Sequence, residues 1–243
     1  MPMNQFGTSS FTGIGVDRAG FDAGLRAHML RVYNYMAGGV GLTGLVAWLA
    51  ANTPLANLVF APGLHLVFML APLGFILALN FGVHRMRSST LQTLFWAFCA
   101  FMGASMAVIF VVYTQASIAR AFFVTASTFA AMSLWGYTTR RDLSSMGAFL
   151  MMGVMGILIA SLINVVMAMV GAPSAMLHWM TSVVGVVVFT GLTAWDTQRI
   201  KQTYAEGHGV EADTKLAVMS ALSLYLNFIN AFQFLLSLIG DRR

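Results

Sequence analysis

Seven long apolar blocks, separated by short connections, fill most of this 243-residue chain and restrict what it can fold into. A helix needs about 20 mostly apolar residues to cross roughly 30 Å of hydrocarbon. The blocks are close to that length, and we place them at residues 33–51, 64–83, 91–114, 118–138, 146–171, 175–196 and 215–240. The chain is therefore predicted to be all-α, a polytopic membrane protein with a bundle of seven transmembrane helices.

The composition excludes several classes of soluble protein. Apolar residues make up 58% of the chain and charged residues only 9%, whereas a water-soluble globular domain carries about 25% charged residues on its solvated surface. The 13 basic residues form no run longer than two, so they provide no phosphate-binding face for nucleic acid. A soluble enzyme, a disordered tail and a nucleic-acid-binding protein are thus all excluded.

Residues 1–32 are predicted to be a cytoplasmic N-terminal segment, and residues 33–243 the transmembrane domain. The first 20 residues are polar and glycine-rich and lack the pattern of a cleaved signal peptide. Apolar residues then recur at helical spacing beside two arginines, which fits an amphipathic helix on the membrane surface. These apolar residues are Phe21, Leu25, Met29 and Val32, and the arginines are Arg26 and Arg31. A plain lead-in to the first span fits equally well.

Basic residues predict the orientation of the chain, because they concentrate in the cytoplasmic connections of membrane proteins. They lie before the first block and in every second connection after it, whereas the opposite connections contain only Arg120. The N-terminus is therefore predicted to be cytoplasmic. Seven spans would then put the C-terminus outside, where Arg242 and Arg243 locally oppose the rule.

Ionisable residues within the blocks are few, and they lack the patterns of known membrane enzymes. No HExxH pair, GxSxG elbow or pair of intramembrane aspartates occurs, and of the histidines only His65 and His178 lie within blocks. The lysines, Lys201 and Lys215, lie at or outside the membrane edges, so no retinal Schiff base is expected. We expect no catalytic residues, no enzymatic activity and no bound cofactor.

Asp196 is the acidic residue most suited to a membrane function, because it lies at the inner end of the sixth block. An ionisable group within a span is costly and is by default a functional candidate. Alternatively, its carboxylate meets water and the basic connection that contains Arg199. Asn227 and Asn230 lie one turn apart in the last block, so they share a face that is predicted to point into the bundle.

Four stretches of the chain resemble one family of membrane proteins. The strings GLTAWDTQRIKQTY at 191–204 and SLYLNFINAFQFLLSLIG at 223–240 resemble the two signature stretches of the Bax inhibitor (transmembrane BAX inhibitor motif) family. Residues 81–92 and 133–153 resemble other regions of the same family, in the family's order and spacing. The resemblance implies a seven-helix bundle in which six helices wrap a central last helix, in the cytoplasmic (inner) membrane of a bacterium.

The resemblance also implies a function and its site. Bacterial relatives are described as pH-sensitive calcium leak channels whose sensor is a pair of aspartates, on helices six and seven, that share a proton. Asp196 matches the first aspartate, but Asn227 stands at the position of the second. An amide can hydrogen-bond Asp196 but never ionises, so the repulsion between two carboxylates disappears. A gate or ion-binding site at Asp196 and Asn227 is implied, with Asn230 and Arg199 as supporting polar residues.

Two functions of different classes follow from this comparison. The first is a cation leak channel or ion-homeostasis protein with a modified pH sensor, in which Asp196 makes a weak calcium contact because calcium prefers several oxygen ligands. The alternative is a non-conducting regulator or binding partner of a membrane-anchored ATP-dependent protease or another membrane complex. The protease would then bind the N-terminal 20 residues of this chain. Asn227 favours the alternative, since a binding partner needs no titrating pair.

Overall fold

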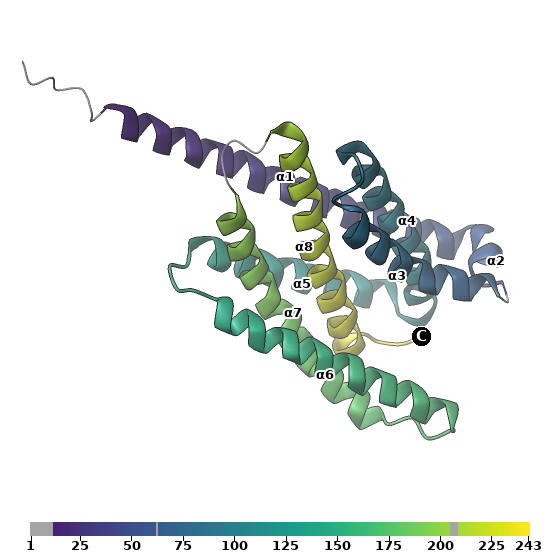
Figure 1. Cartoon of the computed structure of the whole chain (residues 1–243). Coiled ribbons are helices and arrows are strands. Elements are labelled where there is room, and N and C mark those ends of the chain that lie inside the picture. Colours follow the sequence, from purple (N-terminus) through teal and green to yellow (C-terminus); the bar gives the residue numbers. More distant parts are fainter. Residues whose placement is uncertain (1–11, 62, 205–208) are drawn as a thin grey trace, which may run out of the picture.

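A computed structural model of the chain describes residues 12–61, 63–204 and 209–243, and these residues are almost entirely helical. They form eight helices and no β-strand beyond one isolated bridge (Figure 1). The helices are α1 (Thr12–Asn52), α2 (Leu55–Val59), α3 (Leu64–Gly82), α4 (Ser88–Val112), α5 (Gln115–Thr138), α6 (Ser144–Met169), α7 (Ala175–Thr203) and α8 (Val210–Ile239). The predicted all-α class is confirmed.

The seven predicted spans correspond to the C-terminal half of α1 and to α3 through α8. The additional helix, α2, has only five residues and lies in the connection between α1 and α3. Five helices, α4 to α8, are long and apolar enough to cross a membrane, and α3 contains a shorter apolar stretch, Leu66–Gly82. These helices support a polytopic membrane protein, but the predicted count of seven spans is not confirmed.

The outward surfaces of α3 and α6 are strongly apolar. α6 exposes large side chains along its whole length, which water would not favour and hydrocarbon would. They include Phe149, Met152, Met155, Leu158, Leu162 and Val166. α3 does the same with residues such as Leu66, Leu70, Leu73 and Leu77. Such faces are typical of helices that contact lipid.

α1 runs without interruption through the predicted boundary at residue 32. Leu25, Met29 and Val32 are all buried in the main hydrophobic core of the protein. The side chain of Phe21, the fourth residue of the predicted amphipathic pattern, lies outside the described side chains. The apolar face of this segment therefore packs on protein, and its position relative to a membrane surface stays a prediction.

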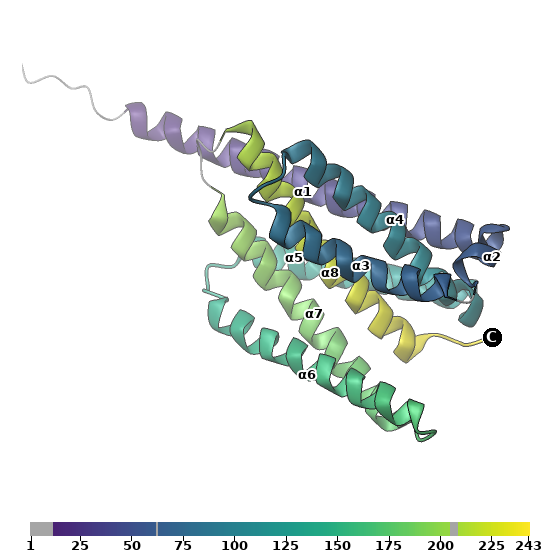
Figure 2. The same ribbon diagram turned by 45° about the vertical axis from the view of Figure 1, so that its right-hand side comes forward.

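α8 lies at the centre of the helix arrangement. It packs against α1, α4, α5 and α7, and a larger part of its apolar stretch is buried than in any of the other four candidate spans. α3 packs mainly on α4, and α6 mainly on α7, so these two helices lie further from α8 (Figures 1 and 2). The last helix is therefore central, with four rather than six helices as its main neighbours.

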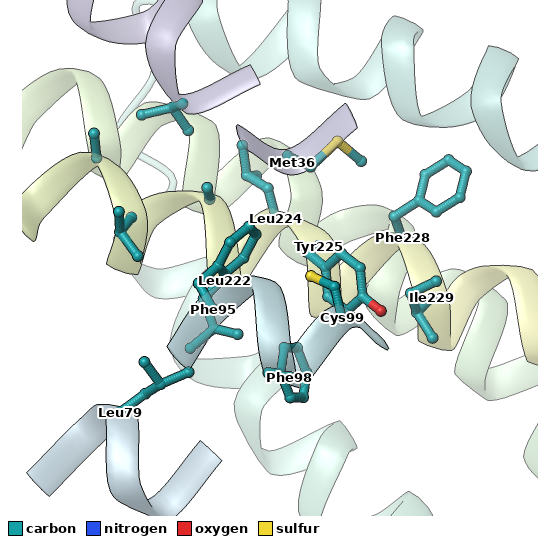
Figure 3. Packing of buried hydrophobic residues seen from close by; sticks show 14 of the residues in the cluster. Met36, Leu79, Phe95, Phe98, Cys99, Leu222, Leu224, Tyr225, Phe228 and Ile229 are labelled. Carbon is teal, nitrogen blue, oxygen red and sulfur yellow. The ribbon is translucent and has the colours of Figure 1, made fainter. Parts of the chain in front are cut away.

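Tyr225 of α8 anchors the core where α1, α4 and α8 meet (Figure 3). Its ring contacts Phe98 edge-on at 5.3 Å between centroids, and Phe95 at 6.3 Å. Its hydroxyl hydrogen-bonds Thr43 Oγ1 at 2.7 Å, and Thr43 donates to the Cys99 carbonyl at 2.9 Å. The one polar atom of this buried ring thus has a partner, as a phenol in a core requires.

Candidate functional site

Asp196 of α7 is buried, with 5% of its surface exposed, and contacts α8 directly. Its Oδ2 accepts one hydrogen bond from Asn227 Nδ2 at 2.7 Å and another from Ser223 Oγ at 2.6 Å. The two central residues of the predicted site are therefore in contact. Ser223 was not predicted, although it lies one turn before Asn227 and so shares its face of α8.

A close approach between α5 and α7 positions this part of α7. Gly136 of α5 faces the backbone of Ala194, and a Cβ at Gly136 would overlap the Ala194 carbonyl oxygen. Only glycine permits this approach, which brings the two helix backbones together two residues before Asp196. Gly136 is itself buried in this contact.

A row of hydroxyl groups fixes the rotation of α7 on its α5 side. Thr197 is fully buried, and its Oγ1 donates to the Thr193 carbonyl at 2.8 Å. The same oxygen lies 3.1 Å from Ser133 Oγ on α5, and Ser133 in turn hydrogen-bonds the hydroxyl of Tyr33 on α1. Because Thr197 faces α5, the neighbouring Asp196 faces α8.

Gln198 ties the same turn of α7 to the connection between α5 and α6. Its Oε1 accepts from the Leu143 backbone N–H at 2.8 Å, and its Nε2 donates to the Arg141 carbonyl at 2.8 Å. Three consecutive side chains, those of residues 196–198, thus bind three different neighbours. The DTQ residues of α7 therefore fix the orientation of this helix, in addition to supplying the Asp196 carboxylate.

The two supporting residues of the predicted site are not bonded to Asp196. Arg199 is exposed and lies over the Trp195 ring, 5.4 Å from its centroid, and within the described residues it forms no ion pair with Asp196. Asn230 donates to the Leu226 carbonyl of its own helix at 2.8 Å. Asn227 and Asn230 thus have different partners, because Asn227 binds Asp196 whereas Asn230 bonds to its own helix.

Two of the cavities that border α8 are lined by residues of the predicted site. A cavity of about 240 Å³, named here the Asp196 cavity, is lined by Asp196, Arg199, Ser220, Ser223 and by Asn80 of α3, among others. A second cavity of about 470 Å³, named here the Asn230 cavity, is lined mostly by apolar residues of α3, α4 and α8, with a few polar groups from the α4 and α8 sides. These lining residues include Ser105, Tyr113, Asn230, Gln233, Met69 and Pro72. Ser220 and Ser223 of α8 therefore line the Asp196 cavity, and Asn230 and Gln233 of the same helix line the Asn230 cavity.

The donor set at Asp196 suits a cation only weakly. The cavity offers one carboxylate, the hydroxyls of Thr203, Ser220 and Ser223 and the amide of Asn80, whereas calcium is usually held by six to eight oxygens that include several carboxylates. No group of three or more His, Cys, Asp or Glu side chains that could hold a metal ion occurs among the described residues. The geometry is that of a hydrogen-bonded carboxylate that a passing cation could contact.

Comparison with known proteins agrees with the signature strings. A family model described as "Inhibitor of apoptosis-promoting Bax1" matches residues 25–243. The chain is 46% identical over 224 residues to the uncharacterized protein RP147 of Rickettsia prowazekii, covering 92% of this chain and 93% of the relative.

Two further relatives match over similar lengths. The inner membrane protein YbhL of Escherichia coli K12 is 41% identical over 230 residues, which are 91% of this chain and 94% of YbhL. An uncharacterized protein of Caulobacter vibrioides is 40% identical over 254 aligned positions, covering 99% of this chain and all of the relative. With its apolar helices and this match over most of its length, the chain belongs to the Bax inhibitor family of membrane proteins.

Proposed function

We propose that this protein is a cation leak channel of the bacterial cytoplasmic membrane, with calcium as a permeant ion and with its N-terminus in the cytoplasm. The location is supported by five candidate spans and by 41% identity to a protein named for the inner membrane. The orientation is supported by the basic residues of alternate connections. The proposed function needs no enzymatic activity and no cofactor.

The contact of Asp196 with α8 is the observation that carries this proposal. A buried carboxylate is costly to a membrane protein unless it is hydrogen-bonded or paired with a cation. Asp196 has two donors, Ser223 and Asn227, and it also lines the Asp196 cavity. A cation that enters this cavity would compete with those donors for the carboxylate, so their separation from Asp196 is the proposed opening step.

The two cavities suggest the route of the ion along α8. Ser223 borders the first cavity and Leu226 the second. Three residues of an α-helix rise about 4.5 Å, so the cavities are less than one helical turn apart along the axis of α8. Asn230 would then act as a polar group on the far part of the route, and Arg199 as a cation at the mouth that competes for Asp196.

Calcium flux into proteoliposomes tests the proposal. Asp196→Asn keeps the size of the side chain and removes its charge, and we expect it to lower calcium flux at least tenfold. Glu211→Gln is the matched control, because Glu211 is an exposed acid whose partner is Lys215 at 3.3 Å. Equal flux in the protein and its Asp196→Asn variant would contradict the assignment of the gate, and absence of flux in both would contradict the channel.

The alternative, a non-conducting regulator of a membrane-anchored protease or another membrane complex, is favoured by one observation. Asn227 leaves a single carboxylate in the contact between α7 and α8, and such a contact serves packing as well as gating. Deletion of residues 1–11 tests it and spares α1, which begins at Thr12. Loss of co-purifying membrane complexes with unchanged calcium flux would support a regulatory role of the N-terminal segment, whereas Asp196→Asn would leave that co-purification intact.

A further inference from the structure

His28 of α1 is a buried histidine without a hydrogen-bond partner. Only 4% of its surface is exposed, and neither ring nitrogen has a partner among the described residues. It lies outside the five candidate spans, in the segment predicted to be cytoplasmic. A buried polar group of this kind destabilises the fold and needs an explanation, since native proteins contain few of them.

The ring of His28 packs under Tyr204, the residue at the C-terminal end of α7. The two ring centroids are 5.3 Å apart, with the rings tilted by 39°. Gly24, one turn earlier in α1, lies under the phenol, and a Cβ there would overlap the Tyr204 hydroxyl. The residues of α1 on this face thus form a surface on which the end of α7 rests.

The charged groups near His28 come from two of the elements packed around it. Asp213, in the first turn of α8, has a buried Oδ1 that also has no hydrogen-bond partner among the described residues. Its charge raises the pKa of His28, whereas Arg31 on α1 lowers it. Burial is the largest influence and leaves the pKa of His28 below its ordinary value of 6.5, so the ring is neutral at pH 7.

We propose that His28, Tyr204 and Asp213 form an acid-released contact that joins α1 to the adjoining ends of α7 and α8. A neutral imidazole can stay buried under Tyr204. An imidazolium carries two N–H donors and a full charge, so it must reach water or the free oxygen of Asp213. Either movement takes the ring out from under Tyr204. Acid would therefore free the ends of α7 and α8 from α1, whether or not the protein conducts ions.

Spin labels across this contact test the inference in the full-length protein in lipid nanodiscs. Ala27 on α1 and Gln202 on α7 are both exposed, so Ala27→Cys and Gln202→Cys accept labels without entering the contact. The native Cys99 is fully buried and does not compete. From about pH 8 to about pH 5, a range that spans histidine titration, we expect a single short distance to give way to a longer, broader distribution.

Substitutions of the neighbouring charges give a two-sided test. Asp213→Asn removes a negative charge, so the midpoint of release should move to lower pH. Arg31→Gln removes a positive charge, so the midpoint should move to higher pH. His28→Phe should hold the short distance throughout, and His84→Gln, which replaces an exposed histidine, should change nothing.

A distance that does not vary with pH would overturn the inference, as would an unchanged pH profile in His28→Phe. If His28→Phe does not fold, Asp213→Asn and Arg31→Gln still test the inference. Release midpoints that do not change in these two variants, or that move in the same direction, would exclude His28 as the titrating group. Gly24→Ala gives a further check, because its Cβ displaces the Tyr204 hydroxyl and should lengthen the distance even at neutral pH. All these outcomes are measured without calcium flux, so they are independent of the proposed function.

Discussion

Replacing Asn227 by aspartate would place a second carboxylate beside Asp196 and should make calcium flux strongly pH-dependent. Asn227 Nδ2 lies 2.7 Å from Asp196 Oδ2, so a carboxyl group of the same size would occupy the same position. Because each negative charge is spread over two oxygens, the charge centres would be about 4 Å apart. At that separation two ionised carboxylates repel by about 4 kcal/mol in a protein of moderate effective dielectric constant.

A repulsion of this size changes the proton affinity of the pair. About 4 kcal/mol corresponds to a factor of about 10³ in the equilibrium constant for losing the second proton of the pair. The two carboxyl groups of the variant should therefore share one proton over a wide pH range and release it when the contact opens. Asn227 cannot ionise, so the unmodified protein lacks this repulsion. We therefore expect a shallow pH profile for the protein and a steep one for Asn227→Asp.

The assay is calcium flux into proteoliposomes between mildly acidic and mildly alkaline pH. Asn230→Asp is the matched control, because it adds a carboxylate to the same helix, one turn further on, in the Asn230 cavity. It should change the amount of flux but not the shape of the pH profile. A profile unchanged in Asn227→Asp would refute the pairing, and a steep profile in the unmodified protein would require another titrating group.

Three further predictions concern stability and are measured by thermal unfolding in detergent. Ser223→Ala removes a hydrogen-bond donor from the buried Asp196 carboxylate and should lower the free energy of unfolding by about 1–3 kcal/mol. An unchanged stability would mean that water replaces the Ser223 hydroxyl. Gly136→Ala forces α5 away from the backbone of Ala194 and should also cost about 1–3 kcal/mol, whereas Gly156→Ala, with open space around its Cβ position, should cost nothing. Because burial lowers the pKa of His28, protonation costs the folded protein no stability above pH 6.5, and stability is lost as pH falls from there through the lower folded pKa. The apparent melting temperature should therefore fall less with acid in His28→Phe than in the unmodified protein.

The positions of most helices and the central contact were predictable from the sequence, whereas the number of helices was not. Membrane spans leave a long apolar signature, and six of the eight helices, α3 to α8, follow the predicted blocks closely. The contact between Asp196 and Asn227 was implied by the family strings and is present. Ser223 could have been found from its spacing, because residues four apart share a helix face.

The remaining contacts depend on packing that a periodic pattern does not contain. Spacing shows that Leu25, Met29 and Val32 share one face of α1, but not whether lipid or protein covers that face. Protein covers it. Asn227 and Asn230 also share a side of α8, yet the side chains at positions three apart diverge by about 60° around a helix axis, which is enough to place them against different neighbours.

The single carboxylate sets what opening this contact requires. If Ser223 and Asn227 moved away from an ionised Asp196, the carboxylate would be left buried and unpartnered, and breaking a buried charge–partner contact in this way costs about 3–5 kcal/mol. Only a group that replaces both donors can avoid that cost, and in the Asp196 cavity the candidates are a proton, water or an entering cation. Arg199 is held over Trp195 and is exposed, so it does not already fill this role. If the entering cation is that group, flux should saturate as calcium rises, because the single carboxylate of this cavity binds one ion at a time. Flux that stays proportional to calcium up to high concentration would mean that Asp196 takes no part in opening.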